Sequence, residues 1–187
     1  MTAVFGRLFR RRSESEAIAA TLYGASVAQA RHPALYDAFG VADTVDGRFE
    51  MVVLHAILVI DRLRVGGGAE QAVGQDVFDL HCADMDRSLR ELGVGDLGVA
   101  KRMKQMSERF YGRAEAYGAA LAARDADALR AAIERNVFAG AAAGALPLAA
   151  YVLAAHDALA AVPPASLLTA PPRFADPAAF AGAGVRA

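Results

Sequence analysis

Apolar residues at helical spacing dominate the sequence between residues 97 and 123. The recurring positions lie three or four residues apart: Val99, Met103, Met106, Phe110, Ala114, Tyr117 and Leu121. This period places all of them on one face of an α-helix, whereas successive residues of a β-strand point to opposite faces. The segment is therefore predicted to be one long amphipathic helix that buries this face.

Similar patterns predict six more helices, which are bounded by proline, by glycine or by capping residues such as Thr44 and Asp125. They are expected over residues 16–30, 43–65, 69–92, 126–139 and 147–161, with a short one ending at residue 39. Alanine, the strongest helix former, is abundant, tryptophan is absent, and strand-like runs of β-branched residues are lacking. The prediction is an all-α fold, a single helical bundle-like domain of about six to seven helices with the 43–65 helix buried at its centre.

The two ends of the chain differ from this helical middle, the expected domain at residues 16–161. Residues 1–15 form a basic and aromatic leader, expected either to contact an anionic membrane surface or to be a frayed soluble end. The residues assigned to membrane contact are Phe5, Arg7, Phe9, Arg10, Arg11 and Arg12. Residues 162–187 hold five of the seven prolines and few charges, so they are predicted to be a disordered tail.

Composition narrows the classes of function. The formal net charge of −1 gives no electrostatic case for a nucleic-acid partner. The single cysteine, Cys82, excludes an internal disulfide and suits a reducing compartment. The apolar stretch at 51–60 is too short to span a membrane. The stretch at 136–155 is long enough, but it is mostly alanine and glycine with Pro147 inside, so a spanning helix is not expected.

No catalytic motif stands out in the sequence. The G-x-G-x-x-G pattern at 93–98 follows a predicted helix rather than a strand, so we interpret it as a tight connection between helices and not as a nucleotide site. No P-loop, H-E-x-x-H or G-x-S-x-G motif is found. These absences disfavour an enzyme without excluding one, because a catalytic triad is defined by geometry.

Two histidines are candidate ligands. His55 lies among apolar residues of the central helix, where it is either a haem ligand or a hydrogen-bonded core residue, and the core role is favoured. His81 and Cys82, close to Asp84 and Asp86, raise the question of a metal. Adjacent helical residues point about 100° apart, however, so the two are not expected to converge on one ion. Neither a metal site nor a cofactor is predicted.

Charges and methionines are concentrated between residues 84 and 106. The residues singled out as a site are Asp84, Asp86, Arg90, Asp96, Lys101 and Lys104, with Met103 and Met106. Asp86 and Arg90 have the i, i+4 spacing of a helical ion pair. The methionines lie on the apolar stripe, where such residues are either core or an adaptable surface for apolar peptides.

This segment resembles the ubiquinol–cytochrome c chaperone family. Within 84–106 the resemblance rests on the strings Asp-Met-Asp, Leu-Arg-Glu-x-Gly-Val-Gly-Asp and Lys-x-Met-Lys. It extends to Leu22-Tyr23-Gly24 with residues 27–31, to residues 43–50, and to Leu54-His55 with the apolar residues that follow. It runs roughly from Ile18 to Leu121 and leaves out the leader and the tail.

The resemblance implies a non-enzymatic chaperone that binds apocytochrome b or an assembly intermediate of respiratory complex III, with a possible small partner protein. For a bacterial chain it implies a cytoplasmic location, peripherally associated with the inner membrane. The eight site residues above are then hypothesised to contact the client or partner, or else the charges lock the helical corner internally. Two other functions stay open: a haem- or quinone-handling protein that uses His55, and a membrane-surface adaptor held by residues 5–12.

Overall fold

The computed structural model describes residues 2–141 and 143–182, and it describes side chains from Glu14 onward. Within these ranges the chain forms seven α-helices and two short 3-10 helices, with no strand. In chain order they are α1 (Thr2–Ala30), α2 (Pro33–Asp37), α3 (Val45–Arg64), α4 (Gly68–Glu91), α5 (Asp96–Ala123), α6 (Ala126–Val137), α7 (Ala145–Ala160), η1 (Pro164–Leu168) and η2 (Pro177–Phe180). The all-α prediction is confirmed, and α1 begins earlier than the sequence pattern indicates.

Two of the predicted capping residues begin their helices as expected. The Thr44 side chain accepts a hydrogen bond from the Gly47 backbone N–H at 3.2 Å, at the start of α3. Asp125 accepts one from the Ala128 N–H at 2.9 Å, at the start of α6. Each cap satisfies one of the backbone donors that the first turn of a helix leaves unpaired.

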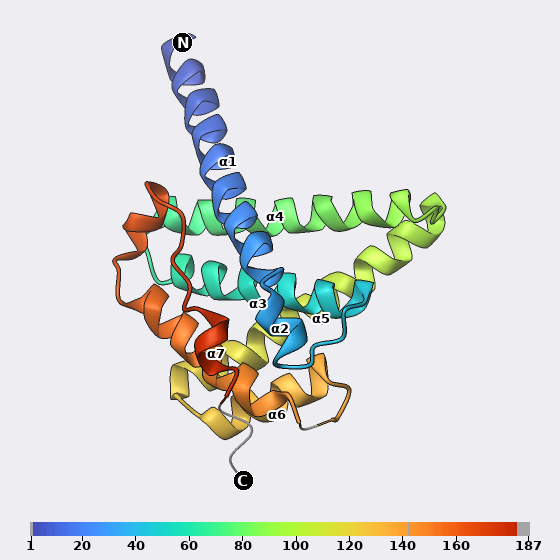
Figure 1. Ribbon diagram of the computed structural model, residues 1–187. Coiled ribbons are helices and arrows are strands. Elements are labelled where there is room, and N and C mark those ends of the chain that lie inside the picture. The colour runs from blue at the N-terminus through green and yellow to red at the C-terminus, as the bar shows by residue number, and fades with distance from the viewer. Residues whose placement is uncertain (1, 142, 183–187) are drawn as a thin grey trace.

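Helix α3 lies at the centre, as its apolar sequence predicts (Figure 1). One side of it, including Met51 and Leu54, packs in a core shared with α5, α6 and α7. Val59 and Leu63 belong to a second core, shared with α1 and α4. Burying each such side chain contributes about 1.5–3 kcal/mol relative to exposure, so both faces of α3 stabilise the fold.

A buried ion pair joins α3 to α5, and neither partner has a role assigned from the sequence. Arg113 donates from Nε to Glu50 Oε2 at 2.6 Å and from Nη2 to Oε1 at 2.5 Å. The side chains of Arg113 and Glu50 are only 10% and 11% exposed. Burial raises the pKa of Glu50, and the two hydrogen bonds from Arg113 oppose that shift. The bidentate geometry holds the two helices in a defined register.

The C-terminal segment through residue 182 packs on the helices, and the prediction of disorder is wrong there. Leu167 is 3% exposed in the core with α1 and α4. Phe174 lies edge-on to His55 with ring centroids 5.3 Å apart, and Phe180 lies 6.2 Å from Tyr151. The physical reason is that a few spaced apolar anchors bind a proline-rich strap to a preformed surface, which average composition does not reveal. Residues 183–187 lie outside the described part.

Candidate functional site

The predicted site lies on an arm made by the end of α4 and the start of α5. Figure 1 shows α4 running past α1 to the edge of the molecule, where the chain turns and returns as α5. We call residues 84–106 the α4–α5 arm. The eight residues predicted as a site lie at the end of α4 and the start of α5, so one helical hairpin carries all of them.

A glycine turn closes the tip of the α4–α5 arm. Gly93 has φ +79°, the left-handed region that glycine enters without steric cost. Its N–H donates to the Arg90 carbonyl at 2.9 Å, and the Val94 N–H donates to the Leu89 carbonyl at 3.1 Å. The G-x-G-x-x-G pattern is therefore a connection between two helices, as predicted, and not a strand-to-helix phosphate loop.

Most charges of the arm are engaged within the chain. Arg90 donates to Asp86 at 2.7 Å along α4 and to Asp96 at 2.6 Å across the turn. These two carboxylates raise the pKa of the Arg90 guanidinium. At the base of the arm, Asp84 pairs with Arg87 at 2.5 Å and accepts a hydrogen bond from the hydroxyl of Tyr23 on α1 at 2.9 Å. The internal locking that the sequence left open is thus present for these residues.

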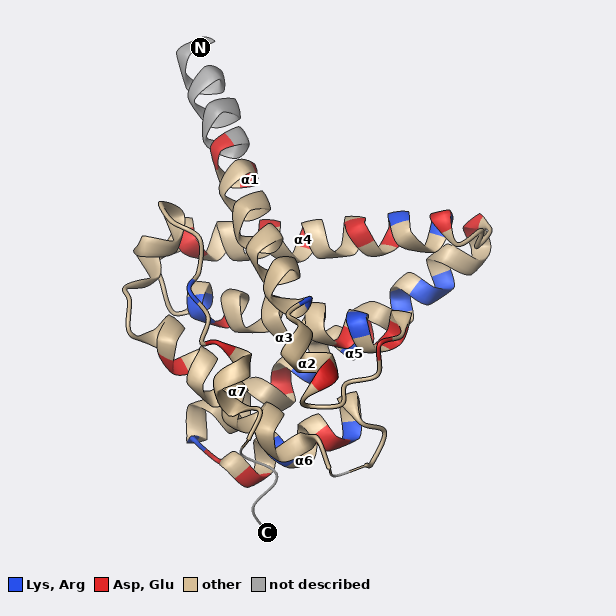
Figure 2. Cartoon of the chain, in the orientation of Figure 1, with Lys and Arg blue, Asp and Glu red and all other residues tan. Residues whose placement is uncertain are grey.

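The two lysines of the arm are free of strong internal partners. Lys104 lies 3.9 Å from Glu108 and is 80% exposed. Lys101 is exposed, and in the part of the chain that the structure describes it forms no ion pair. Figure 2 shows that basic residues gather along the first turns of α5, where the chain returns from the tip of the arm. Lys101 and Lys104 are the only lysines in the sequence, so amine chemistry can address this surface selectively.

Two leucines that were not assigned to the site from the sequence are exposed at the tip. Leu97 is 92% exposed and Leu92 is 63% exposed. The spacing of Met85, Leu89 and Leu92 predicts that Leu92 lies on the buried stripe of α4, but Leu92 is the C-cap residue, beyond the last helical turn, and its side chain is exposed. Leu97 falls off the apolar stripe of α5, and that departure from the period is the signal that finds it.

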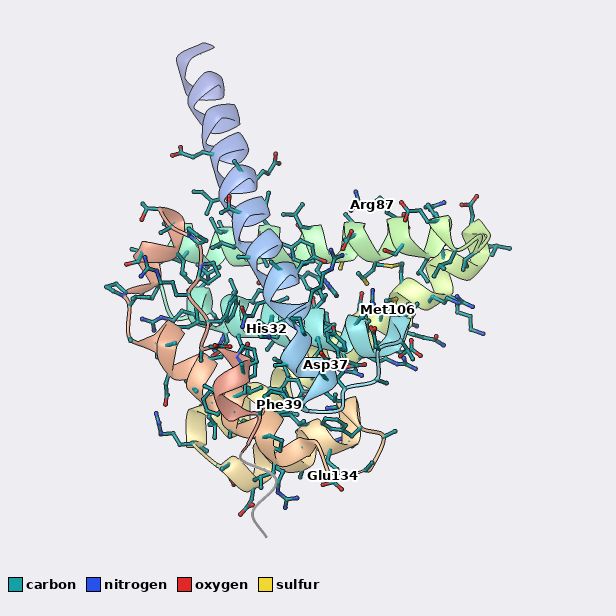
Figure 3. All side chains as sticks on the ribbon, in the orientation of Figure 1. His32, Asp37, Phe39, Arg87, Met106 and Glu134 are labelled. Carbon is teal, nitrogen blue, oxygen red and sulfur yellow. The ribbon has the colours of Figure 1, made fainter. Side chains whose placement is uncertain are left out.

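Met103 and Met106 face inward rather than outward. Both are half-buried and, with Met85, line a small cavity between α4 and α5 (Figure 3). Their neighbours there include Phe78, His81 and Cys82. The methionines therefore form packing between the two helices of the arm, which is one of the two roles that the sequence left open.

A groove runs between α3 and α5 and has an open volume of about 320 Å³. Its floor is apolar, with Ile57, Ile60 and Phe110. Its rim is charged: Asp61 and Arg64 pair at 2.9 Å on one side, and Glu115 lies on the other. Three small residues of α5 line the groove and leave its space open: Ala114, Gly118 and Ala119. Small side chains alone are too weak a sequence signal to predict a groove.

His55 is a hydrogen-bonded core histidine, the role that the sequence favoured. It is fully buried, and Nδ1 lies 2.7 Å from the Met51 carbonyl while Nε2 lies 2.7 Å from the Tyr151 hydroxyl. Burial lowers the pKa of His55 to about 4, so the ring is neutral near pH 7. The Met51 carbonyl only accepts, which makes Nδ1 the donor and Nε2 the acceptor. Both nitrogens are thus occupied, and the position does not favour a haem ligand.

The Tyr151 hydroxyl extends this network to the C-terminal strap. It accepts a hydrogen bond from Gln29 Nε2 at 3.0 Å, and the same Gln29 amide donates to the Ala175 carbonyl at 3.1 Å. Four segments distant in sequence, namely α1, α3, α7 and the strap, meet at one satisfied polar cluster. Such a cluster favours one arrangement of the segments, since any other leaves buried polar groups unpaired.

The structure bears on the prediction about a membrane-spanning helix but not on the prediction that the leader contacts a membrane surface. In the part of the chain that the structure describes, no helix combines the length and apolarity that crossing a bilayer requires, which agrees with the expectation from the sequence. The leader residues proposed to contact a membrane surface lie outside the described side chains: Phe5, Arg7, Phe9, Arg10, Arg11 and Arg12.

The chain matches a known protein family along most of its length. The sequence model of the ubiquinol-cytochrome C chaperone family matches residues 37–174, well over half of the 187 residues. A crystal structure described as the Cbp3 homolog from Brucella abortus is 42% identical in sequence. The match covers 93% of this chain and 98% of that one, with a TM-score of 0.83. No curated protein sequence matches the chain.

Proposed function

The chain belongs to the ubiquinol–cytochrome c chaperone family, and we propose that it binds newly made cytochrome b during assembly of the ubiquinol–cytochrome c reductase complex. The family implies a non-catalytic chaperone role. The observation that carries the proposal is the 42% identity to the Cbp3 homolog over nearly the whole chain. Cytochrome b as the client, and a small partner protein, are the finer parts that need a test.

The groove between α3 and α5 is the surface that suits an apolar client. A membrane protein before insertion exposes apolar helices, and an apolar groove with a charged rim is a common way to hold an amphipathic or apolar helix. The floor at Ile57, Ile60 and Phe110 supplies the apolar contact, and Asp61, Arg64 and Glu115 lie at its edges. An open groove of this kind can admit and release a helix without opening the fold.

The α4–α5 arm is the second proposed contact surface. Its exposed leucines, Leu92 and Leu97, lie close in sequence to the exposed amines of Lys101 and Lys104. Asp84, Asp86, Arg90 and Asp96 hold the shape of the arm, and in this proposal they contact client or partner through their exposed edges. Met103 and Met106 contribute by packing the two helices of the arm together.

Amine-specific crosslinking tests the proposal directly, because only Lys101, Lys104 and the chain N-terminus react. We expect the tagged full chain, crosslinked in its own cells, to capture apocytochrome b in excess over other membrane proteins. The matched control is the K101R/K104R variant, which keeps both charges and removes both side-chain amines. Equal capture of unrelated membrane proteins, or complex III assembly that is unchanged in cells lacking the chain, would refute the cytochrome b assignment.

A groove-filling substitution separates the groove from the arm. Ala119→Leu adds volume at the groove, whereas Ala122→Leu adds the same volume at an exposed position of α5 that does not line it. We expect Ala119→Leu to weaken capture of the client and Ala122→Leu to leave it unchanged, with equal thermal stability. Equal capture by both variants would remove the groove from the proposal and leave the arm.

The proposed location is the cytoplasmic face of the inner membrane, with peripheral attachment through the leader. A segment of arginines and aromatic residues binds anionic lipid weakly, with about 1 kcal/mol for each arginine near the surface. Deleting residues 1–12 is expected to lower flotation with anionic liposomes and to leave flotation with neutral liposomes unchanged. Unchanged flotation with anionic liposomes would assign any membrane attachment to the client instead.

A further inference from the structure

The sulfur-bearing side chains of this protein gather at one place. The sequence has five methionines and one cysteine, and four of these six residues line the cavity between α4 and α5. They are Cys82, Met85, Met103 and Met106. Figure 3 shows sulfur atoms between these two helices. The cavity is small, about 10 Å³, which is room for roughly one water-sized body.

His81 lines the same cavity and has no hydrogen-bond partner among the described residues. It is 3% exposed, and its Nδ1 is wholly buried and unpaired. The rings around it belong to Tyr23, Phe49 and Phe110, with centroids 6.1, 5.8 and 5.3 Å away. An unpaired buried polar atom costs about 1–3 kcal/mol, so such an atom in a native fold indicates a missing partner.

The spacing of these residues suits convergence on a single point. His81 and Met85 are i, i+4 on α4, and Met103 and Met106 are i, i+3 on α5, so each pair lies on one face of its helix. The two faces meet at the cavity. We propose that His81, Met85, Met103 and Met106 form a binding site for one monovalent soft cation, Cu(I).

The chemistry of the lining selects this class of ion. Thioether sulfur and neutral imidazole are ligands for Cu(I), whereas Mg²⁺ and Ca²⁺ require oxygen ligands. No carboxylate lines the cavity, and residues 14–141 and 143–182 contain no group of three or more His, Cys, Asp and Glu placed to hold a metal. Burial lowers the pKa of His81 to about 4, which keeps the ring in the neutral form that can coordinate.

From the sequence a metal was disfavoured, because His81 and Cys82 point about 100° apart. The proposed site does not need both. Its ligands are one imidazole and three thioethers from two facing helices, which sequence spacing within α4 alone cannot reveal. Cys82 lines the cavity as a neighbour, and burial raises the pKa of its thiol, which favours the protonated form.

Anaerobic titration of the purified full chain with Cu(I), in competition with bicinchoninate, tests the site. We expect one Cu(I) per chain, and at least about tenfold weaker binding in the M103L/M106L variant, whose leucines conserve volume and remove both thioethers. His81→Phe is expected to weaken binding as much. Met51→Leu, in α3 and away from the cavity, is the control that should bind as the wild type does.

Three results would overturn the site. These are no retention of Cu(I) by the wild type, equal affinity in the wild type and M103L/M106L, and loss of binding in Cys82→Ser alone. The first would mean that a water molecule satisfies His81, and the last would mean that a lone thiol binds the ion. Circular dichroism confirms the fold of each variant, and if His81→Phe does not fold, the leucine variant decides.

Discussion

The polar groups around His55 on α3 are buried and bonded to one another, whereas those at the tip of the α4–α5 arm are exposed and paired across one turn. His55, Tyr151 and Gln29 form a chain of hydrogen bonds that links α3, α7, α1 and the C-terminal strap. Arg90, with its side chain 52% exposed, links Asp86 and Asp96 at the tip. Both regions are helical, but buried hydrogen bonds stabilise the first and exposed ion pairs stabilise the second.

The difference shows that the two regions contribute unequally to the stability of this molecule. In the interior, loss of one partner leaves a buried group unpaired, which is expensive. At the tip of the arm, water replaces a lost partner at small cost. The arm can therefore change its local arrangement at a smaller cost in free energy than the interior can. Unfolding and hydrogen-exchange measurements on four variants test this division.

Arg113→Ala should be the most destabilising change. It leaves the Glu50 carboxylate buried without its bidentate partner, and breaking a buried pair in this way costs about 3–5 kcal/mol. Urea unfolding at pH 7 measures the loss. Arg48→Ala removes a similar pair with Asp43 at the surface and should change the midpoint little. Similar midpoints for the two variants would show that burial of the pair is unimportant.

Tyr151→Phe should destabilise the interior by about 1–3 kcal/mol, because His55 Nε2 loses its donor and Gln29 loses an acceptor. The midpoint of urea unfolding is again the measurement. Tyr111→Phe is the matched control, since Tyr111 is 60% exposed. A neutral Tyr151→Phe substitution would mean that the network adds no stability.

Acid should destabilise the wild type more than the His81→Phe variant. The pKa of folded His81 is lowered to about 4, below its unfolded value of about 6.5, so the unfolded state binds more protons between these values. The stability due to neutral His81 is complete above pH 6.5 and is lost as the pH falls toward 4. Between pH 8 and pH 5 the wild type should lose about 2 kcal/mol more than His81→Phe. Parallel pH profiles for the two proteins would contradict the lowered pKa.

Arg90→Ala should change global stability least. The expected change is local: faster amide hydrogen exchange around the turn at 92–96 and unchanged exchange in α3. Arg130→Ala, whose ion pairs lie within α6, should leave the exchange of the arm unchanged. A large loss of global stability in Arg90→Ala would show that the arm and the interior unfold as one unit.

The helical spacing of apolar residues and the positions of proline and glycine predicted most of the fold. The helix at 97–123, the caps at Thr44 and Asp125 and the turn at Gly93 are local features, and local sequence specifies them. The resemblance to the chaperone family likewise rests on strings that can be read directly. Leu92 was misplaced because helical period does not say where a neighbouring helix stops covering the stripe.

The helices and most of their limits could be predicted from the amino-acid sequence alone, because hydrogen bonds within a helix and its caps join residues no more than a few positions apart. The family could be predicted as well, because it rests on short strings of the sequence. Which segments meet depends instead on the folded arrangement. The Glu50–Arg113 pair, the strap on His55, the groove between α3 and α5, and the cavity shared by His81 and the methionines all join residues distant in sequence. Such contacts depend on how helices cross and how side chains fill the space between them, and a single sequence carries no local signal for either.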